Sequence, residues 1–219
     1  MTNLPRLYDY WRSSAAYRVR IALNVKGIEY EAIAVSLAPG YAEHRSEAYR
    51  TLNPQMLVPF FDDGNVSIGQ SIAILEYLEE VYPDVPLLPT DRQARAKVRS
   101  LCLSICCDIH PLNNLRVLQY LRKFMASDEE QIAAWYTHWI HEGLRAAEEH
   151  ASDHSSNEQF VFGQTATFAD VALIPQIYNA RRFGVPLDAF PTLVRIADRC
   201  NELPEFQSAA PEVQADSTL

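Results

Sequence analysis

The spacing of hydrophobic positions changes about eighty residues into the chain. Before that point, short apolar runs typical of strands alternate with runs at three- and four-residue spacing, which is the period of a helix. Gly27 is a natural stop for the first helix, and the turn-forming run 62–65 indicates a hairpin. The predicted order is βαβαββα, over residues 7–10, 13–26, 30–35, 41–52, 57–61, 66–68 and 71–82. The first strand, helix and strand predict a right-handed crossover with parallel pairing.

One proline conflicts with the predicted hairpin. Pro59 lies inside the apolar run 57–61, and proline is normally excluded from a central strand because it donates no backbone hydrogen bond. A cis peptide between Val58 and Pro59, at the beginning of an edge strand, resolves this conflict. We therefore predict a cis bond at this position.

The rest of the chain has almost only helical spacing. Three prolines between residues 83 and 89 indicate a linker. Thr167 and Asp170 have the spacing of a capping box at a helix start. The predicted helices cover residues 91–124, 128–151, 168–183 and 191–203. We expect an α/β domain, a linker and an all-α domain, over residues 1–83, 84–90 and 91–219.

Charge and composition narrow the class of protein. The 219 residues carry a formal net charge of −9, which argues against binding nucleic acid or an anionic membrane. No apolar run is long enough to cross a membrane, and the first residues lack the apolar core of a signal peptide. The four cysteines are too few and too clustered for a disulfide framework. We therefore expect reduced thiols and a cytoplasmic protein.

Serines begin two of the helices predicted next to the sheet. Ser13 and Ser14 begin the first, and either can serve simply as the N-cap. Alternatively, this helix N-terminus faces a bound anion or thiolate, which free N–H groups and hydroxyls would stabilise. Local sequence favours neither interpretation. Gln70 and Ser71 begin another helix and leave the same two alternatives, but two such sites with a cis-proline between them favour a peptide-like anion along the sheet edge.

These motifs together resemble a known family. Residues 10–23 read Tyr-Trp-Arg-Ser-Ser-Ala-Ala-Tyr-Arg-Val-Arg-Ile-Ala-Leu, and Leu52-Asn53-Pro54, Val58-Pro59 and Gln70-Ser71 follow. Residues 107–114 and 175–183 agree with the same pattern. Over nearly its whole length the chain is similar to glutathione transferases of the zeta class. The resemblance implies a thioredoxin-like first domain, a helical second domain, glutathione as cofactor, and a homodimer.

The activity associated with this class is that of maleylacetoacetate isomerase. The resemblance implies a glutathione-dependent cis–trans isomerase that forms fumarylacetoacetate in tyrosine or phenylalanine breakdown, by reversible addition of a thiolate to the maleyl double bond. The class commonly has cysteine where this chain has Ala15. Because the reacting thiol belongs to glutathione, this departure removes a protein thiol without removing the implied activity. Neither a metal nor a redox cofactor is implied.

The resemblance also assigns roles to individual residues. Ser13 and Ser14 would hydrogen-bond the sulfur and, with Arg12, form the catalytic set. The residues implied in glutathione binding are Ser13, Ser14, His44, Val58, Pro59, Gln70, Ser71, His110 and Asn114. A maleyl dianion would pair with guanidinium groups, whose geometry suits carboxylates. The arginines implied are Arg12, Arg116 and Arg182; the resemblance favours Arg12 and Arg182 and ranks Arg116 behind them with Arg181, and any one arginine can instead form an ordinary surface ion pair.

Three other groupings carry weaker signals. His110 lies in the long predicted helix, and we expect it to contact the ligand rather than to transfer protons. Cys106 or Cys107 lies within helical reach of this imidazole, but no oxyanion-hole motif accompanies them, so we favour structural thiols. His138 and His141 lack the spacing of a metal-binding helix, and we predict no metal site there.

Four functions remain open from the sequence. The first is isomerisation of maleylacetoacetate, and the second is isomerisation of maleylpyruvate from gentisate-type degradation. The third is a glutathione transferase acting on small α-halo acids. The fourth is a binding or dimerisation module without catalysis. The complete set of paired serines, Val58-Pro59 and Gln70-Ser71 argues against the fourth, because a retired site would not need them together.

Overall fold

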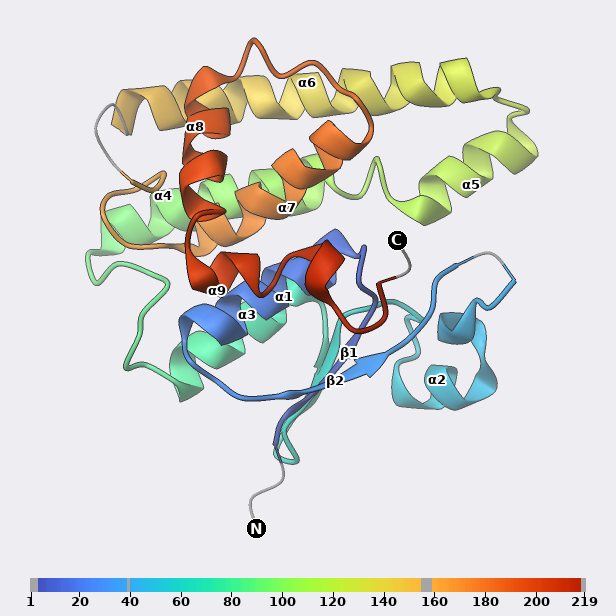
Figure 1. The fold of residues 1–219 in the computed structure, drawn as a ribbon, viewed down its shortest axis with the longest axis horizontal. Coiled ribbons are helices and arrows are strands. Elements are labelled where there is room, and N and C mark those ends of the chain that lie inside the picture. Colours follow the sequence, from blue (N-terminus) through green and yellow to red (C-terminus); the bar gives the residue numbers. More distant parts are fainter. Residues whose placement is uncertain (1–3, 39, 155–158, 218–219) are drawn as a thin grey trace. The chain divides into compact units, whose positions relative to one another are not determined.

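The computed structural model describes residues 4–38, 40–154 and 159–217. The chain divides into two compact units (Figure 1). The first contains Met1–Pro86 together with Asn201–Leu219, and the second contains Leu87–Cys200. The sequence expectation placed the whole of 91–219 in the second domain. The C-terminal segment belongs instead to the first unit, where Ala209 O accepts a hydrogen bond from Arg20 at 2.9 Å.

The first unit contains a four-stranded mixed sheet in the order β2-β1-β3-β4. Strand β1 pairs in parallel with β2 and antiparallel with β3, and β4 completes the hairpin with β3. The strands are β1 (Arg6–Asp9), β2 (Glu31–Ala34), β3 (Phe60–Asp62) and β4 (Ser67–Gly69). The predicted parallel crossover and the hairpin are therefore confirmed.

The sheet is covered on both faces. Helices α1 (Ser14–Val25) and α3 (Ser71–Val81) pack side by side on one face (Figure 1). Leu7 and Phe61 are fully buried, and the ring of Phe61 contacts Tyr77 of α3. Because side chains alternate along a strand, Tyr8 points to the other face, where it meets Tyr49 of α2 (Glu47–Leu52).

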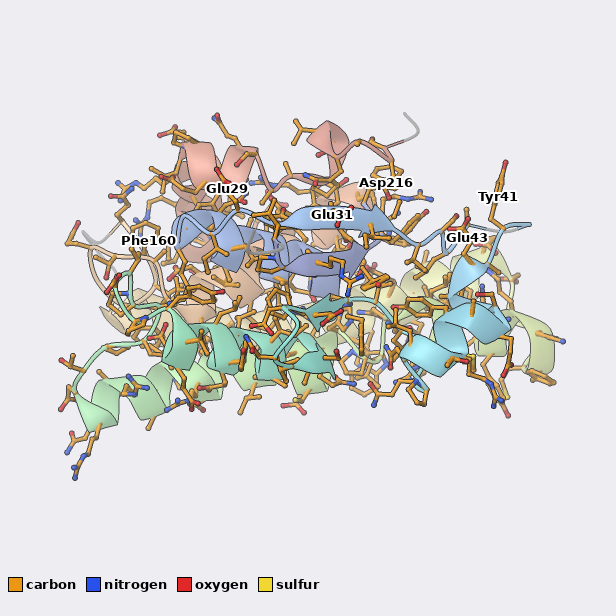
Figure 2. The ribbon with its side chains drawn as sticks, turned by 90° about the horizontal axis from the view of Figure 1, so that it is seen from below. Glu29, Glu31, Tyr41, Glu43, Phe160 and Asp216 are labelled. Atoms are coloured by element: carbon orange, nitrogen blue, oxygen red, sulfur yellow. The ribbon has the colours of Figure 1, made fainter. Side chains whose placement is uncertain are left out.

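The segment predicted as one helix over 41–52 is interrupted. A 3₁₀ turn, η1 (Glu43–Arg45), precedes α2 because Ala42 has a φ of +44° and Ser46 is extended. Strand β2 is an edge of the sheet, and Figure 2 shows Glu31 on this strand, Glu29 just before it and Tyr41 projecting away from the chain. A charged side chain on an edge strand discourages pairing with another molecule.

The second unit is helical. Its helices are α4 (Arg92–Leu103), α5 (Leu115–Phe124), α6 (Glu129–His154), α7 (Phe168–Arg182) and α8 (Pro191–Cys200). The single long helix predicted over 91–124 is wrong. After α4 the chain forms a π-helix, η2 (Ser104–Ile109), and then a turn. Pro111 has no N–H and its ring collides with the preceding turn, so an α-helix cannot continue through it.

Helix α7 forms the centre of the second unit, since 12 of its 15 residues are buried. Its start is fixed by the predicted capping box of Thr167 and Asp170, which the structure confirms. The Asp170 carboxylate accepts hydrogen bonds from Thr167 N and Oγ1 at 2.8 and 2.9 Å, and from Val161 N at 2.8 Å. Asp170 thereby joins the preceding loop to the central helix.

We expect Asp170→Asn to be less stable than the wild type by about 1–3 kcal/mol at neutral pH, because a buried donor loses its acceptor. Burial raises the pKa of Asp170 from 3.8 to about 6. The folded protein therefore holds this proton more tightly than the unfolded chain does, and the carboxyl contributes stability at low pH that is lost as the pH rises through about 6. The difference in free energy of unfolding between the wild type and Asp170→Asn should therefore increase as the pH falls.

Urea unfolding at neutral pH and near pH 4.5 measures this difference. Asp91→Asn is the matched control, because Asp91 is the exposed N-cap of α4 and accepts from Ala94 N at 2.8 Å. Removal of that exposed cap should cost less than the Asp170 change. If the wild type became less stable relative to Asp170→Asn as the pH fell, the prediction that burial raises the pKa of Asp170 would be wrong.

Candidate functional site

The N-terminus of α1 carries the two serines. Ser13 is the N-cap, and its Oγ accepts a hydrogen bond from Ala16 N at 3.2 Å. Ser14 is the first helical residue and is buried. A hydroxyl that accepts from the helix still has its own hydrogen to donate. Capping and stabilisation of a bound anion are therefore compatible at Ser13, and the positive end of the helix dipole favours the anion.

Arg12 precedes these serines and is exposed. Its guanidinium carbon lies 4.7 Å from the centre of the Trp11 ring, and Nη2 donates to the Tyr10 hydroxyl at 3.1 Å. Stacking on an aromatic ring orients the guanidinium plane and reduces the entropy that is lost when it binds a carboxylate.

The N-terminus of α3 forms a second polar cluster. Ser71 is buried, and its Oγ accepts a hydrogen bond from Arg18 Nε at 3.0 Å. Gln70 has a φ of +68°, which is unusual for a residue other than glycine, and its Nε2 donates to Gln55 Oε1 at 2.8 Å. Arg18 lies one helical turn after Ser14 in α1, so the Arg18–Ser71 bond connects the N-terminus of α3 to the second turn of α1.

The peptide bond between Val58 and Pro59 is cis, as predicted. The prediction of an edge strand is wrong, because Pro59 precedes β3, which pairs with β1 on one side and with β4 on the other. The carbonyl just before it, Leu57 O, accepts hydrogen bonds from Tyr49 Oη and Asn53 Nδ2, both at 2.8 Å. Burial raises the pKa of Tyr49 to about 12, so this hydroxyl remains a donor at neutral pH. The two donors fix the segment that presents the backbone of Val58.

His44 is buried in η1, and its Nδ1 lies 3.4 Å from Ser36 O. Burial lowers the pKa of His44, which favours the neutral ring. Because a carbonyl only accepts, Nδ1 carries the hydrogen in this contact, and Nε2 of the neutral ring is an acceptor. Donation from Nε2 to a carboxylate therefore requires His44 to gain a proton.

This donor set in the first unit fits glutathione. Ser71, which accepts a hydrogen bond from the Arg18 cation, can bind a carboxylate. The two hydroxyls at the start of α1 can donate hydrogen bonds to a thiolate. The backbone of Val58 suits a peptide strand. Sequence reasoning overlooked Arg18, Tyr49 and Asn53. An arginine within a buried helix was the available signal for Arg18, and Asn53 belonged to the recognised Leu-Asn-Pro motif.

The other predicted site residues belong to the second unit. The His110 N–H donates to Ile105 O at 2.9 Å across the π-helix. Asn114 is the N-cap of α5 and accepts from the N–H of the exposed Arg116 at 3.1 Å. Short π-helices such as η2 are frequent at functional sites.

Two neighbouring arginines end α7 in different environments. Arg181 pairs with Asp198 at 2.7 Å. Arg182 is exposed, and its guanidinium carbon lies 4.5 Å from the centre of the Phe183 ring, which in turn stacks on Tyr136 at 3.8 Å. Arg182 is thus oriented by an aromatic ring, as Arg12 is, whereas Arg181 is engaged in an ion pair.

The two histidines for which no metal site is predicted, His138 and His141, both lie on α6. Nε2 of His141 lies 2.9 Å from Pro186 O, and His138 packs against Trp139. In the part of the chain that the structure describes, no group of three or more His, Cys, Asp or Glu side chains is arranged to hold a metal ion. Across these same ranges, none of the helices combines the length and apolar character needed to span a bilayer.

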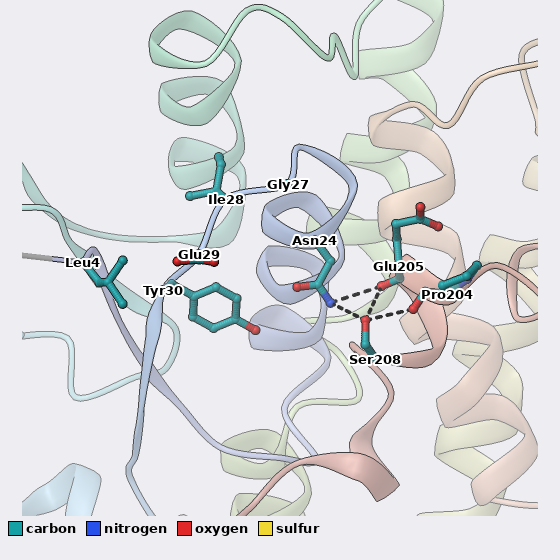
Figure 3. Close-up of a pocket in the computed structure, with 9 residues that line it drawn as sticks. All are labelled: Leu4, Asn24, Gly27, Ile28, Glu29, Tyr30, Pro204, Glu205 and Ser208. Atoms are coloured by element: carbon teal, nitrogen blue, oxygen red, sulfur yellow. Dashed lines mark hydrogen bonds between the residues drawn. The ribbon is translucent and has the colours of Figure 1, made fainter.

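A pocket of the first unit lies at the opposite end of α1 from Ser13 (Figure 3). There Asn24 Nδ2 donates to Glu205 O at 3.1 Å and to Ser208 Oγ at 3.0 Å. Glu29 and Tyr30 form part of its wall. The lining includes none of the residues predicted to bind glutathione.

Comparison with known proteins identifies the family of the chain. Residues 5–80 match the N-terminal domain of glutathione S-transferases. A probable maleylacetoacetate isomerase from Vibrio cholerae is 48% identical over 96% of this chain and 97% of its own length. A maleylpyruvate isomerase described as a zeta-class bacterial glutathione S-transferase has a TM-score of 0.94 at 46% identity, over 97% of this chain and 100% of its own.

A third similar protein is the maleylacetoacetate isomerase of Anaeromyxobacter dehalogenans. Its structure with glutathione in the active site has a TM-score of 0.88 at 39% identity and covers both chains completely. Another structure of it holds dicarboxyethyl glutathione and citrate. The chain therefore belongs to the glutathione transferase family. Within that family its relatives are the zeta-class maleylacetoacetate and maleylpyruvate isomerases.

Proposed function

We propose that this protein is a glutathione-dependent cis–trans isomerase that converts maleylacetoacetate to fumarylacetoacetate. The observation that carries the proposal is the hydrogen bond from the buried Arg18 to Ser71, which connects the N-terminus of α3 to the helix that Ser13 and Ser14 begin. Relatives of nearly equal length that are named maleylacetoacetate isomerase support it.

Each side chain has a task in this proposal. The hydroxyls of Ser13 and Ser14 donate to the sulfur and hold it as a thiolate. When bound, glutathione supplies the nucleophile whose reversible addition to the maleyl double bond permits rotation about that bond. Arg12 stabilises the negative charge that develops on the conjugated carbonyl. The residues that bind glutathione are Ser13, Ser14, His44, Val58, Pro59, Gln70, Ser71, His110 and Asn114.

The experiment that tests this function follows the loss of maleyl absorbance with and without glutathione. Turnover should require glutathione. Turnover that is undiminished without it would overturn the proposal.

Arg182 and Arg116 hold the substrate carboxylates in this proposal, together with Arg12. A protein of net charge −9 attracts no dianion through its overall field, so binding depends on these local cations. Maleylacetoacetate carries two carboxylates, and a guanidinium can bind a carboxylate through two parallel hydrogen bonds.

Arg182→Ala should raise the KM for the maleyl substrate about 10- to 100-fold, the equivalent of one charged hydrogen-bonded contact. The KM for glutathione should stay near the wild-type value. Arg181→Ala is the matched control, because it removes the neighbouring charge from the same helix end but breaks only the exposed pair with Asp198. If Arg182→Ala instead lost affinity for glutathione, Arg182 would belong to the glutathione subsite, and its assignment to the substrate carboxylates would be wrong.

Maleylpyruvate is the second candidate substrate, and the structural similarity to a maleylpyruvate isomerase favours it. Both substrates are maleyl dianions that the same arginines would bind. A comparison of kcat/KM on the two substrates decides between them. The higher value identifies the physiological reaction class, namely breakdown of tyrosine and phenylalanine or gentisate-type degradation.

Two further properties belong to the proposal. The family resemblance supports a homodimer. The cysteines support a cytoplasmic location, because none of the four forms a disulfide in the structure, which is what a reducing compartment would produce.

A further inference from the structure

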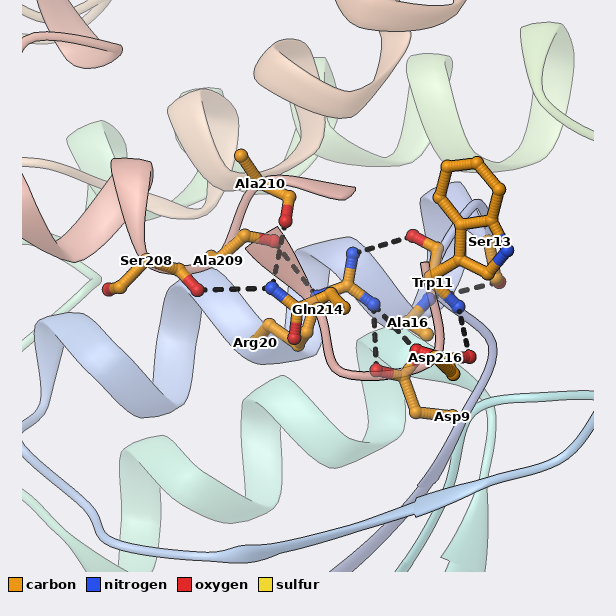
Figure 4. A network of polar contacts seen from close by, with 10 residues as sticks. All are labelled: Asp9, Trp11, Ser13, Ala16, Arg20, Ser208, Ala209, Ala210, Gln214 and Asp216. Carbon is orange, nitrogen blue, oxygen red and sulfur yellow. Dashed lines mark hydrogen bonds and ion pairs between the residues drawn. The ribbon is translucent and has the colours of Figure 1, made fainter. Parts of the chain in front are cut away.

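The turn before the catalytic serines is held by the far end of the chain. Trp11 N donates to Asp216 Oδ2 at 3.1 Å, across 205 residues of sequence. Trp11 O accepts from Arg20 Nη2 at 2.9 Å. Both polar atoms of one backbone residue, two positions before Ser13, are therefore bonded to side chains (Figure 4).

Arg20 is the centre of this arrangement and is fully buried. Its Nη1 donates to both carboxylate oxygens of Asp9, at 2.8 and 2.7 Å, and its Nε donates to Ala209 O at 2.9 Å. One guanidinium thus joins strand β1, the turn at Trp11 and the C-terminal segment.

The C-terminal segment is itself folded into a closed turn. Gln214 Nε2 donates to Ser208 O at 3.0 Å and to Ala210 O at 2.8 Å (Figure 4). The segment includes α9 (Pro204–Gln207) and η3 (Pro211–Val213), and α9 packs against α1. These contacts hold the segment that carries Asp216 in place next to Trp11.

Resting on the proposed function, we propose that Asp216 is a positioning residue for thiolate stabilisation, which acts by fixing the turn from Tyr10 to Ser13. This turn is closed by a hydrogen bond from Ser13 N to Tyr10 O at 2.8 Å. The direction of the Trp11 peptide determines where Arg12 and Ser13 leave the turn. A displacement of about 1 Å in such groups is enough to impair catalysis severely.

Asp216 acts through geometry and not through its charge. A carboxylate near a thiolate raises the pKa of the thiol, which opposes the role of the site. The side-chain amide introduced by Asp216→Asn would keep an oxygen that accepts from Trp11 N, so this variant should preserve the function. Asp216→Ala removes the acceptor and should not.

Two readouts test this in the full-length protein. The first is hydrogen exchange of the Trp11 amide without ligand. The second is the pKa of the thiol of bound glutathione, titrated through the ultraviolet absorbance of the thiolate. For Asp216→Ala we expect exchange at least about tenfold faster and a thiol pKa raised by about one unit, the equivalent of losing one well-aligned donor. Asp216→Asn should match the wild type in both.

Glu212→Ala is the matched control, because it removes an exposed carboxylate from the same segment. It should leave both readouts unchanged. If Asp216→Ala does not fold, Asp216→Glu displaces the carboxylate by one methylene and serves in its place.

An Asp216→Ala variant with unchanged exchange, or with faster exchange but an unchanged thiol pKa, would overturn the positioning role. An Asp216→Asn variant as impaired as Asp216→Ala would also overturn it. A wild-type protein that fails to lower the thiol pKa of glutathione would instead refute the proposed function. Hydrogen exchange of the Trp11 amide would still show whether Asp216 holds this backbone N–H.

Discussion

Replacing Ser13 and Ser14 together by alanine should lower kcat/KM for the isomerisation about 10²- to 10³-fold, the effect typical of removing hydrogen-bond donors from a developing or stabilised charge. Both hydroxyls lie at the positive end of α1, and neither has a substitute on the helix, because positions 15 and 16 are alanine. The thiol pKa of bound glutathione should rise in parallel.

The same change removes an N-cap, so its effect on stability must be measured separately. Loss of the Ser13 cap should cost about 1 kcal/mol. Ser46→Ala is the matched control, since Ser46 caps α2 in the same manner, with its Oγ accepting from Tyr49 N at 3.1 Å. It should reproduce the loss of stability without the loss of activity.

The single variants divide the effect between the two serines. Ser13 shares its oxygen with the Ala16 N–H, whereas Ser14 is the more buried of the two. Wild-type activity in the double variant would show that the thiolate is stabilised elsewhere.

Local chemistry made part of this site predictable from the sequence. The serine N-cap, the Thr167–Asp170 capping box and the cis bond before Pro59 each depend on residues close together in the chain. The parallel crossover and the hairpin were predictable from the order of the elements, because each depends on consecutive segments of the chain.

Contacts between distant segments were not predictable in the same way. Arg18 meets Ser71 across 53 residues, and Arg20 meets Ala209 across 189. Helical spacing marks a position as buried, but it does not reveal which distant backbone atoms a buried guanidinium will satisfy. For the same reason the sequence assigned the C-terminal segment to the helical domain.

The break after α4 was missed for a different reason. The apolar spacing of residues 91–124 continues through Pro111, so periodicity alone extends the helix. Proline interrupts a helix on steric grounds, but the size of this interruption depends on the register that the π-helix introduces at Ser104–Ile109.

Arg20→Met should produce the largest loss of stability, about 3–5 kcal/mol, because it leaves a buried carboxylate without its counter-ion. Asp9 and Arg20 are both buried and are joined by two hydrogen bonds. The carbonyls of Trp11 and Ala209 would lose their donor as well. Unfolding in urea at a fixed protein concentration measures the loss.

A second substitution separates the charge from the packing. Asp9→Asn combined with Arg20→Met removes the stranded carboxylate, so the double variant should be more stable than Arg20→Met alone. Burial, the largest effect on this group, raises the pKa of Asp9. Protonation is therefore easier in the folded state than in the unfolded chain, and Arg20→Met should regain stability relative to the double variant as the pH falls.

Asp216→Ala is the reference against which the loss of stability in Arg20→Met is compared. It removes one partly buried acceptor at the rim of the same network, whereas Arg20→Met removes all the donors at its centre. We therefore expect a much smaller loss of stability from Asp216→Ala. If Arg20→Met cost no more than Asp216→Ala, or if adding Asp9→Asn brought no recovery, the buried ion pair would not be what holds β1, the serine-bearing turn and the C-terminal segment together.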